Sequence, residues 1–144
     1  MNLAIDPDLL DEIHRHGEAA YPEEGAGFLF GADDGARRVT AIFPLENSRE
    51  DGARHNRYLI TPRDYLRAEN EADRLGLTLL GVFHSHPDHP NRPSEYDRDW
   101  AQPWFSYIIT SINAGKAVES RSWRLNDERQ FAEEAITVAP VVEK

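Results

Sequence analysis

The sequence predicts an α/β protein: one mixed β-sheet flanked by helices, in a single domain over residues 1–144. Three observations predict it. Apolar residues recur at helical spacing in two long segments, each of which begins with an N-cap residue followed by proline. Short apolar runs rich in β-branched and aromatic residues lie between those segments. Helices and strands therefore alternate along the chain, an order that favours a sandwich built around one sheet.

The first part of the chain contains one helix, two strands and a polar loop. Helical spacing predicts a helix over Pro7–Ala20, with Asp6 as its N-cap. The runs Gly25–Gly31 and Val39–Asn47 are separated by a turn and predict two strands. The polar, glycine-containing segment Ser48–Asn56 predicts a surface loop that could border a binding cleft.

The second part begins with a brief strand at 57–60 and a helix that runs from its N-cap Thr61 to its stop signal Gly76. The nearly continuous apolar run 77–87 ends in histidines, as expected of a central strand whose tip opens into a site. The remaining elements are a short helix from Ser94, a buried strand at 104–112, and a segment at 117–138 that alternates around Trp123 and Leu125 and turns at Asn126–Asp127.

Composition excludes several classes of function. The net charge of -10 would repel phosphate backbones and anionic lipid surfaces, so we expect neither nucleic acid nor membrane as a partner. The chain has no cysteine, which removes thiolate catalysis and every zinc site that needs sulfur ligands. Charged residues interrupt the apolar residues of the amino terminus, so it resembles neither a signal peptide nor a membrane span. We expect a soluble, cytoplasmic protein.

Two H-x-H pairs occur, and their predicted secondary structure separates them. Residues two apart in a strand share a face, so His84 and His86 can bind one ion. His14 and His16 lie in the predicted first helix, where residues two apart do not face each other. We expect these two, and His55 in the polar loop, to be ordinary surface histidines.

One candidate ligand set extends the strand pair with Asp88 and His89, giving the H-x-H-x-D-H pattern of metallo-β-lactamase-like hydrolases. That binuclear pattern needs further histidine ligands downstream, and no histidine follows His89. The chain is also short for a fold whose two halves both contribute ligands. A motif without its structural context is usually a false positive.

The other candidate set extends the pair with Ser94 and Asp97. S-x-x-D at a helix start also resembles a capping box, so these two residues have a structural alternative. Residues three apart share a helix face, however, so both side chains can face the tip of the preceding strand. Two imidazoles and one carboxylate leave a fourth position open for water, as in a catalytic zinc site.

The stretch GVFHSHPDHPNRPSEYD resembles the signature of the JAMM (MPN-plus) metalloprotease family in its order, spacing and flanking Gly and Pro. YPEEGAGFLFG is similar to the Glu-containing first strand of that family, RYLITPRDYLRA to a later strand and helix, and YIITSI to the strand after the site. No large insertion interrupts the resemblance, which is closest to the compact prokaryotic branch. It implies a cytidine-deaminase-like sandwich and a peptidase acting on ubiquitin-like sulfur-carrier proteins.

Position by position, the resemblance implies that His84, His86 and Asp97 are zinc ligands and that Ser94 stabilises the oxyanion. It implies that Glu24 is the general base, with the adjacent Glu23 as its rival. The family usually has a Cys-Gly pair after this glutamate, and here the cysteine position is alanine, a difference that we expect to affect packing rather than chemistry.

The implied function is zinc-dependent hydrolysis of the peptide or isopeptide bond after the C-terminal Gly-Gly of a small ubiquitin-like sulfur-carrier protein. A catalytically silent MPN scaffold for protein assembly is the alternative from another class; such scaffolds lack part of the ligand set, which this chain retains. Zinc deaminases have a related architecture but use paired cysteines, which are absent here.

Overall fold

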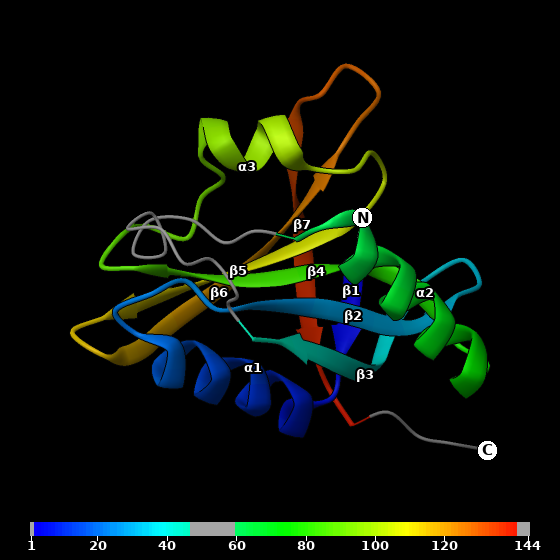
Figure 1. Ribbon diagram of the computed structural model, residues 1–144, viewed down its shortest axis with the longest axis horizontal. Coiled ribbons are helices and arrows are strands. Elements are labelled where there is room, and N and C mark those ends of the chain that lie inside the picture. Colours follow the sequence, from blue (N-terminus) through cyan, green and yellow to red (C-terminus); the bar gives the residue numbers. More distant parts are fainter. Residues whose placement is uncertain (1, 47–59, 141–144) are drawn as a thin grey trace.

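The computed structural model describes residues 2–46 and 60–140, which form seven strands and three helices (Figure 1). In chain order the elements are β1 (Asn2–Ile5), α1 (Pro7–Ala20), β2 (Ala26–Asp33), β3 (Arg37–Leu45), α2 (Pro62–Leu75), β4 (Thr78–Pro87), α3 (Glu95–Trp100), β5 (Ser106–Asn113), β6 (Lys116–Leu125) and β7 (Phe131–Val138).

Helices α1 and α2 begin at their predicted N-caps, and α2 ends at its predicted glycine stop. The Asp6 carboxylate accepts a hydrogen bond from the Asp8 amide at 2.9 Å and caps α1. A reciprocal capping box between Thr61 and Asp64 begins α2, and Gly76 ends it in the left-handed conformation, with φ 70°. Glycine adopts this conformation without the steric cost that a Cβ would add. The predicted bounds of α1 and α2 are thus confirmed.

The strands occur in the order β1-β3-β2-β4-β5-β6-β7, and the sheet closes into a barrel. The pairs β4–β5, β1–β3 and β1–β7 are parallel and the others antiparallel, so the predicted mixed sheet is confirmed. The predicted sandwich is not confirmed, because β1 pairs with both β3 and β7 and joins the two ends of the sheet.

Strand β1 is the element that the sequence interpretation missed. It has four residues, of which Leu3 and Ile5 are fully buried. Its alternation of buried and more exposed residues is too short to be recognised as periodicity in the sequence. It is a strand because it pairs with β3 and β7. The predicted strand at 57–60, the loop Ser48–Asn56 and the loop residue His55 lie outside the described residues, apart from Ile60.

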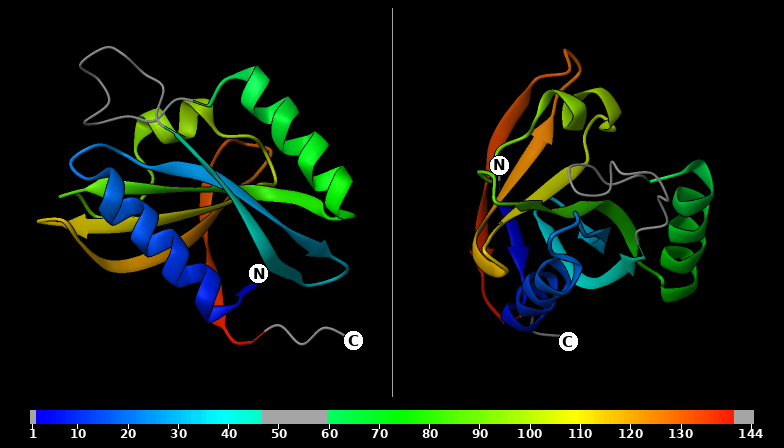
Figure 2. Two further views of the ribbon diagram at one scale, coloured as in Figure 1. Left: turned by 60° about the horizontal axis from the view of Figure 1, so that its bottom comes forward. Right: turned by 60° about the vertical axis from the view of Figure 1, so that its left-hand side comes forward.

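Helices α1 and α2 cover opposite faces of β2 (Figure 2). Successive strand residues point to opposite faces. Phe28 packs in one core cluster with Ala68 of α2, whereas Leu29 packs in a second cluster with Ile13 of α1. Both faces of the neighbouring strand β4 are also buried, up to its carboxyl end at Pro87. That end is where the histidine pair lies.

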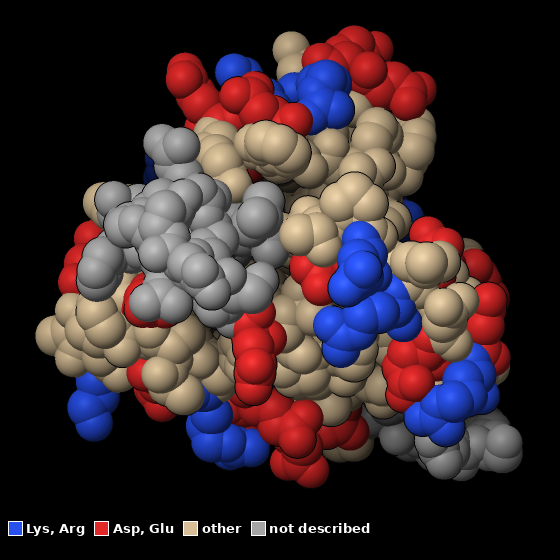
Figure 3. All heavy atoms as spheres, viewed as in Figure 1, with Lys and Arg blue, Asp and Glu red and all other residues tan. Residues whose placement is uncertain are grey.

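On the face drawn in Figure 3, acidic and basic side chains are interspersed among the described residues. None of the helices in the described part of the chain combines the length and apolar character needed to cross a bilayer.

Candidate metal centre

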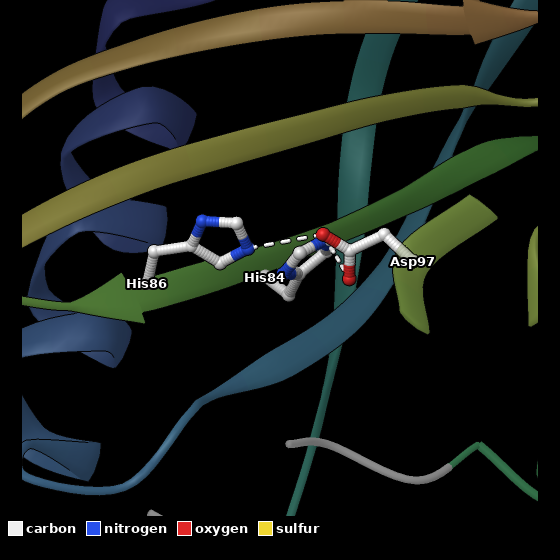
Figure 4. A group of neighbouring side chains, drawn as sticks. All are labelled: His84, His86 and Asp97. Carbon is white, nitrogen blue, oxygen red and sulfur yellow. Dashed lines mark hydrogen bonds and ion pairs between the residues drawn. The ribbon is translucent and has the colours of Figure 1, made fainter. Parts of the chain in front are cut away.

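Two histidines of β4 and one aspartate of α3 meet in a buried group (Figure 4). His84, His86 and Asp97 are 1%, 7% and 3% exposed, and each offers one ligand atom within 4.8 Å of the others. As period-two geometry predicted, both imidazoles face α3, whereas Ser85 lies between them on the α1 side, close to Gly17. The structure thus brings together the three residues of the H-x-H and S-x-x-D pattern.

The hydrogen bonds of His86 determine how its ring is oriented. Its Nδ1 lies 2.7 Å from the carbonyl oxygen of Pro90, and its Nε2 lies 3.1 Å from Asp97 Oδ2. A carbonyl only accepts, so Nδ1 carries a proton and donates it. In the neutral ring the Nε2 lone pair then faces a carboxylate oxygen, an arrangement that requires a proton or a cation between them. Metal-bound histidines characteristically donate their second N–H in this way.

The protonation states of the other two residues also fit a metal. Burial lowers the pKa of His84 to about 4, against an opposing effect of Asp97, so its imidazole is neutral at pH 7. Burial alone would raise the pKa of Asp97, but the nearby His84 and His86 outweigh it and hold this pKa below its ordinary value. Neutral imidazole and ionised carboxylate are the forms that bind zinc.

In helix α3 the S-x-x-D motif forms a capping box and also directs Asp97 toward the histidine pair. The Ser94 hydroxyl accepts the Asp97 amide at 3.1 Å, and Asp97 Oδ2 accepts the Ser94 amide at 2.8 Å, which completes a capping box. The same Asp97 carboxylate faces both histidines. Accepting the amide does not use the hydroxyl proton of Ser94, so capping is compatible with a donor role.

A cavity of about 650 Å³ opens beside the group. Its lining includes His86, Ser94 and the buried Glu24, but not the half-buried Glu23. The full set of lining residues is Glu24, His86, His89, Pro90, Arg92, Ser94, Glu95 and Tyr96.

Strand register explains the position of Glu24. Ala26 pairs with His84 across β2 and β4, and Gly25 makes two bonds to Ser85: its amide donates to the hydroxyl at 2.8 Å and its carbonyl accepts the Ser85 amide at 3.0 Å. Residues two apart share a face, so Glu24 lies on the face of the histidines. A Cβ on Gly25 would come within 2.8 Å of His16 Nδ1, so glycine allows this close approach.

The rival ligand Asp88 is turned away from the group. One of its carboxylate oxygens accepts the Tyr21 hydroxyl at 2.6 Å and the other accepts the Ala114 amide at 2.8 Å. His89 lines the cavity but is exposed, and its carbonyl accepts the Ser111 hydroxyl at 2.7 Å. Both residues belong to the loop between β4 and α3 rather than to the buried cluster.

The prediction that His14 and His16 are surface residues is wrong. Both are half-buried: His14 Nε2 lies 2.8 Å from Ser120 Oγ on β6, and His16 Nε2 lies 3.2 Å from the carbonyl of Leu45. Burial lowers the pKa of each ring. The two rings point in different directions, as helical geometry requires. Helix α1 packs closely enough on the sheet for one ring to reach β6 and the other to reach β3.

The sequence offered no signal for the residues that hold the loop between β4 and α3. The buried Asn91 donates to the carbonyl and the carboxylate of Glu119, and Trp123 Nε1 donates to the Asn91 carbonyl at 3.1 Å. Both partners come from β6. Because this loop supplies the Pro90 carbonyl that orients His86, β6 indirectly fixes the imidazole.

A second cavity, of about 610 Å³, lies between α2 and α3 and is mostly apolar. Tyr96 lines both cavities, so the apolar groove adjoins the candidate metal centre. Its walls include Leu66 and Trp100, which are 58% and 59% exposed. The full lining is Ile60, Pro62, Tyr65, Leu66, Glu69, Tyr96, Trp100, Gln102 and Phe105.

Several relatives match this chain over most of its length. A Thermus thermophilus protein named probable TtuB-protein conjugate cleaving protease is 32% identical over 115 residues, which are 80% of this chain and 74% of that protein. A Pyrococcus furiosus protein named desampylase is 28% identical over 115 residues, 80% of this chain and 76% of the relative. The names of both relatives indicate a hydrolase.

Solved structures share the fold. A solution structure from Desulfitobacterium hafniense superposes with a TM-score of 0.84 at 31% identity and covers 98% of this chain and 95% of its own. A structure described as JAMM, a metalloprotease-like zinc site in the proteasome and signalosome, superposes with a TM-score of 0.54 at 18% identity and covers 95% of this chain and 99% of its own. The latter likeness is one of fold alone.

Residues 6–126 match the family described as prokaryotic homologs of the JAB domain. This match includes α1, the Glu24 segment, the histidine pair and α3. The chain therefore belongs to the JAMM, or JAB, domain family, in its prokaryotic branch.

Proposed function

We propose that this protein is a zinc-dependent peptidase or isopeptidase that hydrolyses the bond after the C-terminal Gly-Gly of a small ubiquitin-like sulfur-carrier protein. One observation carries the proposal: a buried group of two imidazoles and one carboxylate borders a cavity that also contains Glu24 and Ser94. The names of the relatives, a conjugate-cleaving protease and a desampylase, support hydrolysis of such substrates.

His84, His86 and Asp97 would hold the ion. The fit rests on their donor atoms, on the neutral His84 imidazole and on the Nε2 of His86, which faces a carboxylate. A zinc ion bound there would supply Lewis-acid chemistry, lowering the pKa of a bound water and polarising the scissile carbonyl.

In this mechanism Glu24 accepts the proton of the attacking water and transfers it to the leaving amine. Its burial in the wall of the cavity suits this role, since exclusion of water strengthens its interactions with the reacting atoms. Ser94 donates its hydroxyl proton to the developing oxyanion while its oxygen continues to cap α3.

The partner protein would extend its Gly-Gly tail into the cavity, because a tail without side chains can approach the ligands closely. The adjacent apolar groove, with the exposed Leu66 and Trp100, offers a surface for the folded part of that protein. Pairing of the tail with a strand edge near Ser48–Asn56, a further expectation from the sequence, involves a loop outside the described residues.

We propose the cytoplasm as the compartment.

The silent-scaffold alternative is disfavoured because the complete residue pattern is clustered in space. The metallo-β-lactamase-like alternative is disfavoured because both Asp88 oxygens accept hydrogen bonds from Tyr21 and Ala114.

Metal titration of two aspartate variants tests the ligand set. We expect Asp97→Ala to abolish stoichiometric zinc binding, since the variant loses the only carboxylate in the group. Asp88→Ala should bind zinc like the wild type, measured by competition with a chromogenic chelator. The reverse result would exclude the JAMM ligand assignment.

Two glutamate variants test the chemistry. We expect Glu24→Gln to retain zinc and to lose hydrolysis by a factor of about 10² or more, as removal of a general base does. Glu23→Gln is the matched control and should cleave normally. The assay is mass spectrometry of a ubiquitin-like carrier with residues beyond its Gly-Gly, with and without chelator. Cleavage by Glu24→Gln at the wild-type rate would exclude Glu24 as the base.

A further inference from the structure

The helix that carries Asp97 is short. Helix α3 has six residues, Glu95–Trp100, and isolated helices of this length are unstable in water. Its amino-terminal end is closed by the capping box of Ser94 and Asp97. The capping box holds Asp97 locally, and the orientation of the helix that carries it also depends on what fixes its other end.

Arg129 contacts that other end. Its guanidinium donates hydrogen bonds to the carbonyl of Arg98 and, at 3.3 Å, to the carbonyl of Ala101. Carbonyls at the end of a helix have no partner within the helix, and an arginine side chain commonly satisfies them. Arg129 lies in the turn between β6 and β7, which stands beside α3 (Figure 1).

The backbone of this turn points to a role for the Arg129 side chain. Arg129 has φ 58°, the left-handed conformation in which a Cβ is unfavourable and glycine is the easiest residue to accommodate. The turn is closed by Asn126, whose carbonyl accepts the Arg129 amide at 3.1 Å and whose side chain accepts the Gln130 amide at 2.9 Å. A larger residue keeps such an unfavourable conformation only where the surrounding structure holds it, and residues of this kind cluster at functional positions.

Packing does not fill the space between α3 and the start of β7. A cavity of about 270 Å³ lies there, lined by Pro93, Ser94, Glu95, Arg98, Gln130 and Phe131. Arg129 is adjacent to this cavity in the chain, next to Gln130, and its hydrogen bonds connect the turn to the carboxyl end of the helix.

We propose that Arg129 is a positioning residue for the metal centre. By holding the carboxyl end of α3, it keeps Asp97 turned toward His84 and His86. This inference rests on the proposed zinc site. Arg129 contacts neither the ligand atoms nor the substrate cavity among the described residues, so its effect on metal binding acts through the helix.

The variant Arg129→Gly separates this role from a role in the turn alone. Glycine accommodates φ 58° without strain, so the turn is retained while the guanidinium is removed. We expect the zinc dissociation constant, measured by chelator competition, to rise about 10-fold or more, the effect typical of losing an outer support of a metal ligand. The visible spectrum of the Co²⁺-substituted protein should change as well.

Arg129→Lys retains a cation that can reach one carbonyl and should bind zinc with intermediate affinity. Arg38→Gln removes an exposed arginine of another hairpin and is the matched control, with no expected change. Zinc affinity within twofold of wild type for Arg129→Gly would overturn the inference; if that variant does not fold, the same criterion applies to Arg129→Lys.

Asp97→Ala in the same titration distinguishes the two proposals. If it binds zinc like the wild type, the proposed metal site is wrong. If it loses zinc while Arg129→Gly binds normally, only the inference about Arg129 fails.

Discussion

At the scale of single residues, burial decides the chemistry of His84. Its side chain is inaccessible to solvent, and burial lowers its pKa to about 4. A histidine that is neutral at pH 7 without any metal is already in the form that binds one. The cost of charging it makes the stability of the metal-free protein dependent on pH.

We expect the free energy of unfolding of the metal-free protein to fall as the pH is lowered from 6.5 toward 4. In this window the unfolded histidine binds a proton that the folded one does not, so stability rises with pH. The contribution of His84 is on the order of 1 kcal/mol for each pH unit. Urea denaturation at several pH values measures it.

His84→Asn is the control for this prediction, because asparagine does not titrate. His14 and His16 also have lowered pKa values, so they add to the dependence of stability on pH in both proteins. The contribution of His84 is therefore the difference between the variant and the wild type. If the free energy of unfolding depends on pH equally in the two proteins, His84 is not buried in its neutral form.

At the scale of elements, successive side chains of β4 point to opposite faces, and the two faces make different contacts. His84 and His86 face α3, and Ser85 between them accepts a hydrogen bond from the amide of Gly25, the residue before β2. The strand therefore aligns the candidate base with the candidate ligands, because Gly25 adjoins Glu24 in the chain. Ser85 is the link between them.

We expect Ser85→Ala to lower kcat about 10-fold while zinc affinity stays within about threefold of wild type, since small displacements of a catalytic group have large effects on rate. Loss of the hydrogen bond leaves the buried Gly25 amide without its acceptor and also lowers stability by about 1–3 kcal/mol. Steady-state kinetics and chelator competition measure the two effects.

Ser122→Ala is the matched control for this change. Ser122 on β6 is another buried serine, and its hydroxyl donates a hydrogen bond to the carboxylate of Glu134 on β7 at 2.8 Å. Its loss should cost stability without affecting kcat. Unchanged kcat in Ser85→Ala would mean that strand pairing alone positions Glu24.

At the scale of the whole molecule, the four residues of β1 close the sheet. Strand β1 joins β3 to β7, and its fully buried Ile5 packs in the core cluster that includes Leu29 and Val39. A strand that closes a barrel removes both free edges of the sheet. Stability should therefore depend on β1 more than its length suggests.

We expect Ile5→Ala to lower the free energy of unfolding by about 2–5 kcal/mol, the usual effect of emptying a core position. Val118→Ala on β6, where the side chain is 60% exposed, should change it by less than about 0.5 kcal/mol. Chemical denaturation of the two variants provides the comparison. Equal effects would mean that β1 contributes little to the closed sheet.

Local signals predicted much of this fold. Caps and helical spacing predicted the bounds of α1, a cap and a glycine stop predicted those of α2, and an apolar run ending in histidines located β4, because these features depend on neighbouring residues alone. Strand β1, the closure of the sheet and the half-buried His14 and His16 depend on partners distant in the sequence, which periodicity does not reveal.

For the candidate site, the sequence by itself determined which residues share a face: period two in a strand for His84 and His86, and i, i+3 in a helix for Ser94 and Asp97. Only the tertiary structure decided that these faces meet, that Asp97 both caps α3 and faces the histidines, and that Arg129 holds the far end of that helix. The reason is physical: local geometry fixes the direction of a side chain, whereas long-range packing fixes what that side chain meets.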